Sequence, residues 1–258
     1  MAEEWIGEVL RRTRRDSIDV ALRWARASTT APLGMWWHRT LHVAHRRLDD
    51  WEADPVPVTD RPLPGDPGTV QSVDDGVGPL HRRRYEVRIE TDATPADVLA
   101  TLPEDLDAGT PDLFVRFLDA DRRAPSRLEV GDELMARLTG PVDGPVRVAV
   151  VEPTRVVLAT LTGHAEAGLI RFTTAQDGHG NVQFAVTSWA RSSTPLVRWL
   201  YERGGGRDVQ AHVWTHLCLA LAQRHGRPVG RVVVADRVDP WPLESSPLEP
   251  GPLEDGGG

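Results

Sequence analysis

The sequence predicts an α+β fold in which an antiparallel sheet packs against a long helix near the end of the folded region. Four strand-like runs lie between residues 146 and 189, and short turns separate them. Consecutive strands joined by short loops pair antiparallel. Farther on, Val209, Val213, Leu217 and Leu221 recur at helical spacing and form an apolar stripe. We therefore expect a helix that ends near His225 and covers one face of the sheet.

The other elements follow from alternation and from turn signals. The first strand is expected at residues 81–91, where Tyr85, Val87 and Ile89 alternate with charged residues. Thr94 followed by Pro95 predicts the start of a short helix that ends near Leu102. Further strands are expected at residues 113–118 and 133–138. The run from 229 to 234 is either a final strand or an extended strap.

Proline and glycine divide the chain into four parts. Residues 53–75 are rich in both and predict a linker, because proline blocks helices and disfavours sheet interiors. Residues 1–52 are expected to form an N-terminal extension of two helices, over residues 4–26 and about 35–51, and residues 76–236 the α+β domain. Residues 237–258 carry Pro-Leu-Glu three times and contain acids but no base after position 238. This composition predicts a disordered acidic tail.

Composition excludes several classes of function. The net charge of −8 argues against a nucleic-acid binder, which needs a basic surface to neutralise phosphates. Cys218 is the only cysteine, so no disulfide can form within the chain. No apolar run approaches the ~20 residues that span a bilayer, and the first residues lack the apolar core of a secretory signal. We expect a cytoplasmic protein with no transmembrane segment.

One motif resembles a known family. The stretch TLTGHAEAGLIRF occupies residues 160–172, with SWARS at 188–192, VQAHVWTH at 209–216 and GVGP at 76–79. Together they resemble the domain-of-unknown-function family numbered 1990, which occurs in actinobacteria and plants. The resemblance covers about residues 76–225 and implies a fold but no activity. The element order is similar to helix-grip (START-like) proteins, whose curved antiparallel sheet wraps a long C-terminal helix around a cavity.

His164 and Glu166 lie together in the connection between two expected strands. A histidine titrates near neutral pH and a carboxylate can orient it, so the pair could perform acid–base chemistry. The same residues could equally satisfy buried backbone groups in a tight turn. The sequence leaves both interpretations open.

Two further groups of residues are candidates for ligand contacts. His212 and His216 stand four positions apart and share one face of the expected helix. A zinc site needs a third protein ligand, which this pair lacks, so we expect neither a metal nor a cofactor. His38, His42 and His45 show similar spacing in the N-terminal extension and are interpreted as surface or interface residues. The second group consists of Trp189, Arg191 and Trp214. Their indole and guanidinium groups could line a cavity or belong to the core.

Three functions are compatible with these observations. The first is binding of a small apolar or amphipathic molecule in a cavity between sheet and helix. Its candidate contacts are His164, Glu166, Trp189, Arg191, His212, Trp214 and His216. The second is an enzyme that uses the histidines and Glu166 as acid–base groups on such a ligand. The third is contact with a protein partner, or self-association, through residues 1–52. No phosphate-binding glycine loop or nucleophile elbow favours another class.

Overall fold

A computed structural model describes residues 35, 38–45, 69–110, 115–138, 144–203 and 206–239. The predicted helix at 4–26, residues 53–68 of the linker and the tail from 240 lie outside these residues. In chain order the elements are β1 (Val43–His45), the 3-10 helix η3 (Val73–Asp75), β2 (Val77–Glu90), α2 (Pro95–Ala100), α3 (Leu102–Ala108), β3 (Val115–Leu118), β4 (Glu133–Leu138), β5 (Gly144–Glu152), β6 (Arg155–Thr160), β7 (Glu166–Gln176), β8 (Val182–Ser192), α4 (Pro195–Arg203), α5 (Gly206–His225) and β9 (Arg227–Asp239).

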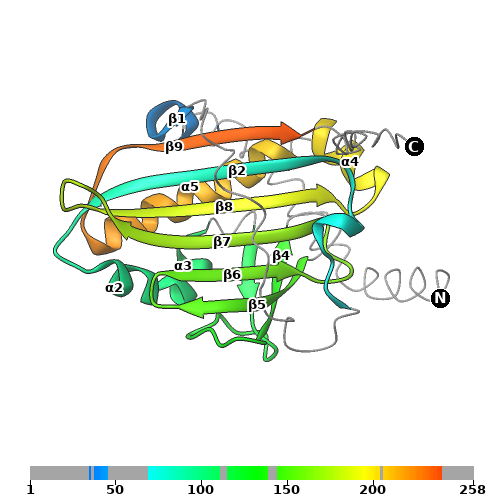
Figure 1. Cartoon of the computed structure of the whole chain (residues 1–258), viewed down its shortest axis with the longest axis horizontal. Coiled ribbons are helices and arrows are strands. Elements are labelled where there is room, and N and C mark those ends of the chain that lie inside the picture. Colours follow the sequence, from blue (N-terminus) through cyan, green and yellow to red (C-terminus); the bar gives the residue numbers. More distant parts are fainter. Residues whose placement is uncertain are drawn as a thin grey trace, which may run out of the picture.

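The described strands form a single curved sheet in the order β1-β9-β2-β8-β7-β6-β5-β4-β3 (Figure 1). Neighbouring strands from β9 to β3 pair antiparallel. For β5 to β8 the short connections predicted this pairing. β1 pairs parallel to β9, with Val43 opposite Val232. The sheet is therefore mixed, and the prediction of a purely antiparallel sheet was wrong at this edge.

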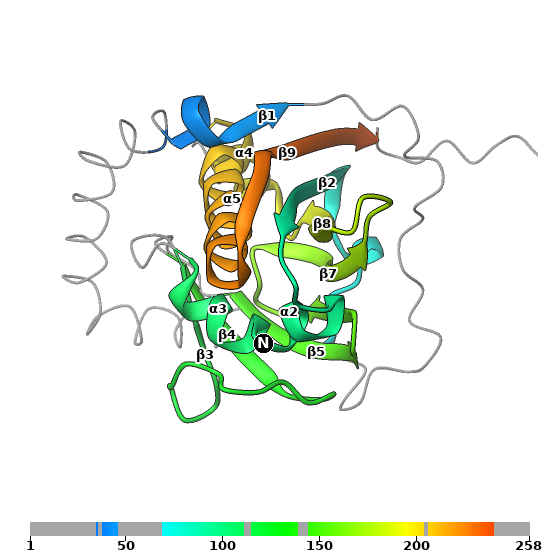
Figure 2. The ribbon, with the colours of Figure 1, turned by 90° about the vertical axis from the view of Figure 1, so that its left-hand side faces the viewer.

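Helix α5 lies along the concave face of the sheet and contacts β2, β8 and β9 (Figure 2). We call this concave face the inner face. Val213, Leu217 and Leu221 of the predicted apolar stripe are all buried there. They pack into one cluster with the inner-face residues of β2 and β8, which include Tyr85 and Phe184. Burial of this continuous apolar surface is the main stabilising contribution to the fold.

Strand β9 follows α5 and enters the sheet between β1 and β2. Of the two alternatives expected for residues 229–234, a final strand and an extended strap, the structure shows the strand. β9 ends at Asp239, beyond the predicted domain limit at 236. Residues 69–71, which we assigned to the linker, also bind the sheet, since Gln71 N donates to Thr160 O at 2.8 Å.

Two helix predictions need correction. Residues 38–42 are helical, but the predicted helix over 35–51 ends before β1, because Val43 to His45 pair with the edge of β9 instead. Tertiary pairing outweighs local helical propensity here. The helix expected from Pro95 to Leu102 is two short helices, α2 and α3. Pro103 lacks an N–H and its ring crowds the carbonyl four residues earlier, so the first helix cannot continue through it.

Among the described helices, none combines the length and apolar character that crossing a membrane requires.

Candidate functional site

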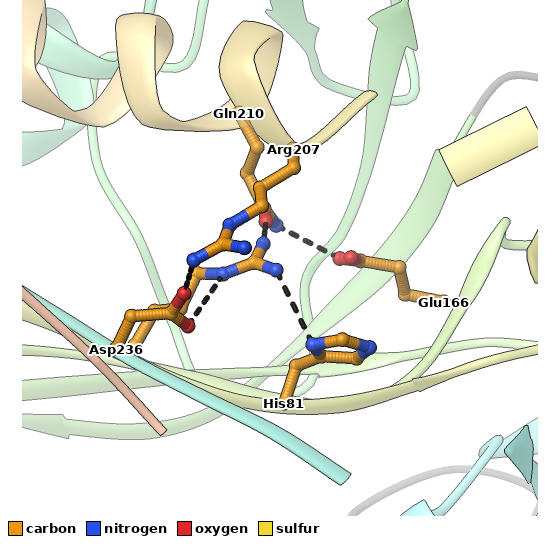
Figure 3. A network of polar contacts seen from close by, with 6 residues as sticks. His81, Glu166, Arg207, Gln210 and Asp236 are labelled. Atoms are coloured by element: carbon orange, nitrogen blue, oxygen red, sulfur yellow. Dashed lines mark hydrogen bonds and ion pairs between the residues drawn. The ribbon is translucent and has the colours of Figure 1, made fainter. Parts of the chain in front are cut away.

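The inner face of the sheet carries a group of polar side chains beneath the first turns of α5. We call it the inner-face network, and Figure 3 shows it from close by. It comes from strands β2, β7 and β9 and from helix α5. Its members are His81, Arg83, Glu166, Arg207, Gln210 and Asp236.

Arg83 is the centre of this network. It lies on β2 at the same side of the strand as Tyr85, and only 3% of its surface is exposed. Its Nε donates to Asp236 Oδ1 at 3.3 Å, and one terminal nitrogen donates to Gln210 Oε1. The other terminal nitrogen lies 3.4 Å from His81 Nδ1. A guanidinium can be buried only when partners of this kind replace its water.

Gln210 links the cation to a carboxylate. Its amide oxygen accepts from Arg83 and its amide nitrogen donates to Glu166 Oε2 at 3.0 Å. Burial raises the pKa of Glu166, and the Arg83 charge and the Gln210 hydrogen bond act in the opposite direction. The protonation state of the Glu166 carboxyl therefore depends on the balance between its burial and these two interactions. Shifted carboxyl pKa values of this kind are common at functional sites.

Asp236 closes the network toward the solvent. It lies directly opposite Arg83 in the β2–β9 ladder, so the two side chains share the inner face. Arg207, in the first turn of α5, also pairs with Asp236. Two arginines thus bind the Asp236 carboxylate. Arg207 is exposed to solvent, and Arg83 is buried.

Two hydrogen-bond donors, one on the inner face and one on the helix that covers it, have no partner among the described residues. The first is the hydroxyl of Tyr85, whose side chain is fully buried two residues beyond Arg83. Burial raises its pKa, so the group stays a neutral O–H. The second is Trp214 Nε1 on α5. A buried donor without an acceptor costs about 1–3 kcal/mol, so such groups need an explanation.

His164 and Glu166 are neighbours, but their side chains do not form an acid–base pair. The Glu166 N–H donates to His164 Nδ1 at 2.8 Å, so the backbone occupies the nitrogen that a carboxylate would orient. The imidazole packs over Gly144, where a Cβ atom would lie 2.6 Å from two ring atoms. Burial lowers the pKa of His164 to about 4. These contacts fit the interpretation of His164 as a residue that satisfies backbone groups in a tight turn. The Glu166 side chain instead belongs to the inner-face network.

The low pKa of His164 makes a prediction about stability. The folded state disfavours the proton down to about pH 4, whereas the unfolded chain binds it below about 6.5. The stabilising contribution is therefore complete above pH 6.5 and is lost as the pH falls toward 4. His164→Asn keeps an acceptor for the Glu166 N–H but does not titrate. We expect it to reduce the pH dependence of the unfolding free energy in this window by up to about 1.4 kcal/mol per pH unit.

Urea unfolding of both proteins between pH 4 and 7 measures this difference. His179→Asn, in the exposed turn between β7 and β8, is the control for loss of one histidine. Equal slopes for the His164 variant and the unchanged protein would show that the imidazole already carries its proton in the fold.

His212 and His216 lie on one side of α5, as predicted, and the structure places His38 against them. The His38 ring stacks on His216 with centroids 4.0 Å apart and meets His212 edge-on at 4.9 Å. His38 is 7% exposed. The expectation that the α5 pair lacks a third imidazole was therefore wrong, because the N-terminal helical segment supplies one.

The remaining candidate residues occupy two different places. Trp214 belongs to the apolar core, with its ring 5.8 Å from Phe172 and 6.3 Å from Phe117. Trp189 and Arg191 lie on the opposite face of the sheet, which we call the outer face, because strand alternation separates them from the inner-face residues Phe184 and Val186. Arg171 stacks on the Trp189 ring at 4.8 Å. The seven predicted residues thus do not line one cavity.

A hollow of about 380 Å³ lies on the outer face near the β9 edge. Arg84, Glu86 and Arg88 of β2 contribute polar groups to it, and Val229 and Val233 of β9 contribute apolar surface. Arg84 pairs with Glu86 at 3.0 Å. None of the seven predicted residues lines this hollow.

Sequence reasoning missed most of the inner-face network. The alternation that places Tyr85, Val87 and Ile89 on the buried face also places Arg83 and His81 there, and this signal was available. A basic residue at a buried strand position is unusual and marks a site. Asp236 and Arg207 gave no such signal, because their proximity arises only when β9 pairs with β2.

These observations define the class of the protein. It has an α+β fold, and a buried polar network lies under its long helix. The model of the domain of unknown function DUF1990 matches residues 115–218. The predicted family resemblance is confirmed over this range, which contains the motifs at 160–172, 188–192 and 209–216. A comparison with curated proteins gave no match.

Several solved structures are partly similar. A conserved protein from Geobacillus kaustophilus is 14% identical, with a TM-score of 0.40 over 56% of this chain and 97% of its own. For a protein from Thermus thermophilus, TTHA0849, the identity is 16% and the TM-score 0.40, over 55% of this chain and 95% of its own. A hypothetical protein from Helicobacter pylori is 8% identical, with a TM-score of 0.41 over 67% of this chain and 96% of its own. Similarity at this level carries no information about function.

Proposed function

We propose that the protein binds a small amphipathic organic molecule between the inner face of the sheet and α5. The inner-face network holds the polar group of this molecule, and apolar side chains of the helix and sheet contact the rest. The observation that carries the proposal is the buried Tyr85 hydroxyl, which has no hydrogen-bond partner among the described residues and lies two positions from the buried Arg83. An oxygen-bearing ligand would accept from this hydroxyl and remove the cost of its burial.

The energetics of the network support a role in recognition. A buried ion pair contributes little to stability, and apolar residues of the same size often replace it without loss. Away from the network, the inner face is packed mainly with apolar side chains. Retaining Arg83, Asp236 and Glu166 at one end of it fits a site that binds a polar group.

The order of elements gives a second line of support, by analogy. A long strand, two short helices, antiparallel strands and a helix across the sheet resemble the helix-grip arrangement. Proteins of that type hold ligands between the sheet and the helix, which is where the network lies. Pockets that combine apolar walls with a few convergent polar groups are typical of small-molecule sites.

Native mass spectrometry of the full chain, purified from the organism that makes it, tests the proposal. We expect a mass above that of the denatured chain, with the excess released on unfolding as one small organic molecule. Arg88→Ala removes a side chain from the outer-face hollow and is the matched control, which should retain the bound mass. Loss of the bound mass in Arg88→Ala, or a bare native chain that also fails to bind lipid-like and aromatic acids added to it, would contradict the proposal.

A further inference from the structure

Three imidazoles from distant parts of the chain meet beside α5, away from the residues proposed to bind the organic ligand. His212 and His216 are one helical turn apart on α5, and His38 comes from the N-terminal helical segment. Each ring offers a nitrogen, and these three nitrogens lie within 4.8 Å of one another. A tetrahedral Zn²⁺ with bonds of about 2.0–2.1 Å places its ligand nitrogens roughly 3.3 Å apart. Ligation therefore requires side-chain rotations that bring the nitrogens closer and turn the His38 and His216 rings, which are stacked with centroids 4.0 Å apart, toward one point.

The chemistry of the cluster suits a transition metal. All three groups are imidazoles, which are ligands typical of zinc, copper and nickel, whereas calcium and magnesium prefer oxygen. A neutral imidazole has one ring nitrogen whose lone pair can bind such a cation.

The fold holds His38 in place by contacts on either side. Thr215, 1% exposed, donates its hydroxyl hydrogen to the carbonyl of Ala211, and its oxygen lies 2.9 Å from His38 Nε2. This hydrogen bond occupies Nε2, which leaves Nδ1 as the ring nitrogen that can face an ion. A second partner of this kind orients the ring in most histidine–metal sites. The β1–β9 pairing begins five residues later and anchors the segment to the sheet.

From this geometry we propose that His38, His212 and His216 bind a divalent transition-metal ion of the Zn²⁺ class. Three protein ligands leave the fourth position open to water or to an incoming group, as in sites where zinc is accessible. His42 lies beside the cluster, with its ring centroid 5.4 Å from that of His38. It is exposed, so it can approach an ion held by the buried His38 and the half-buried His212 and His216. The site also ties the N-terminal segment to α5.

Zn²⁺ titration of the untagged full chain, after treatment with a chelator, tests this site. We expect one Zn²⁺ per chain by calorimetry and by elemental analysis. His38→Ala and His216→Ala should each weaken binding by at least about 100-fold, more than the 10–100-fold typical of a lost outer partner. His179→Ala, in the exposed β7–β8 turn, should bind as the unchanged chain does.

Two further measurements hold even if an alanine variant unfolds. Thr215→Val preserves the shape of the side chain and removes its hydrogen bond to His38, so it should weaken Zn²⁺ binding by about 10–100-fold with unchanged stoichiometry. In the unchanged chain, nitrogen NMR of the histidine rings should show Zn²⁺-dependent shifts for His38, His212 and His216. Absence of one-to-one binding, or shifts confined to other histidines, would overturn the proposal.

Discussion

Arg83→Ala is expected to lower the free energy of unfolding by about 3–5 kcal/mol. The substitution removes a buried cation that binds Asp236 and Gln210 and lowers the pKa of Glu166. Arg207 still pairs with Asp236, but Glu166 loses the nearby positive charge and keeps only the Gln210 amide. Removing one partner of a buried charge pair costs more than the pair contributes, because the other group remains desolvated.

Arg84→Ala is the matched control for this prediction. It is the next residue on the same strand, faces the outer side and pairs with Glu86. Its side chain is 29% exposed, against 3% for Arg83. Solvent-exposed pairs contribute about 0–1 kcal/mol, and this half-buried pair should therefore cost far less to break than the buried Arg83 contacts. Chemical denaturation of both variants measures the contrast, and equal losses would show that Arg83 is no more essential than a surface arginine.

Gly168→Ala is the second substitution with a large expected effect. A Cβ atom at this position would lie 1.9 Å from the carbonyl oxygen of Trp189 on the neighbouring strand. The obstacle is backbone, so it cannot move without separating β7 from β8. Gly168 is also bound on both sides by Thr160, whose Oγ1 accepts from its N–H at 2.9 Å. We expect a loss of about 3 kcal/mol or more.

The same substitution at Gly178 separates this clash from the general effect of removing a glycine. Gly178 lies in the exposed β7–β8 turn, and an added Cβ would meet nothing within 4 Å. Its variant should unfold within about 0.5 kcal/mol of the unchanged protein. Thermal or chemical unfolding decides between the two cases. A stable Gly168→Ala variant would mean that the two strands do not approach as closely as the structure shows.

The predictable part of the fold is the part encoded by local patterns. Alternation along residues 81–91 and the turn at Asp177–Gly180 place β2, β7 and β8 correctly, because neighbouring residues determine both. The capping box is equally local: the Asp97 N–H donates to Thr94 Oγ1 and the Thr94 N–H donates to the Asp97 carboxylate. Pairing of β1 with β9 was not predictable, since it joins residues 43 and 232, which no local signal connects.

The difference between local patterns and long-range contacts also explains which residues of the candidate sites were predicted. Glu166, His212 and His216 were singled out because they occur within short motifs, and each has a specific partner in the structure. The partners themselves, Arg83 for Glu166 and His38 for the α5 histidines, come from other strands and segments. Trp189 and Arg191 share a motif with inner-face residues but point to the outer face, because one step along a strand reverses the side chain.

Tyr85→Phe tests the central claim most directly, because binding and stability should change in opposite directions. Without a ligand, removing this buried hydroxyl, for which the described part of the chain offers no partner, should raise the free energy of unfolding by about 1–3 kcal/mol. In native mass spectrometry of protein from the producing organism, the same variant should lose the small molecule that the unchanged chain retains. A variant that is less stable without ligand, or that retains the bound mass in full, would contradict a role for this hydroxyl in binding.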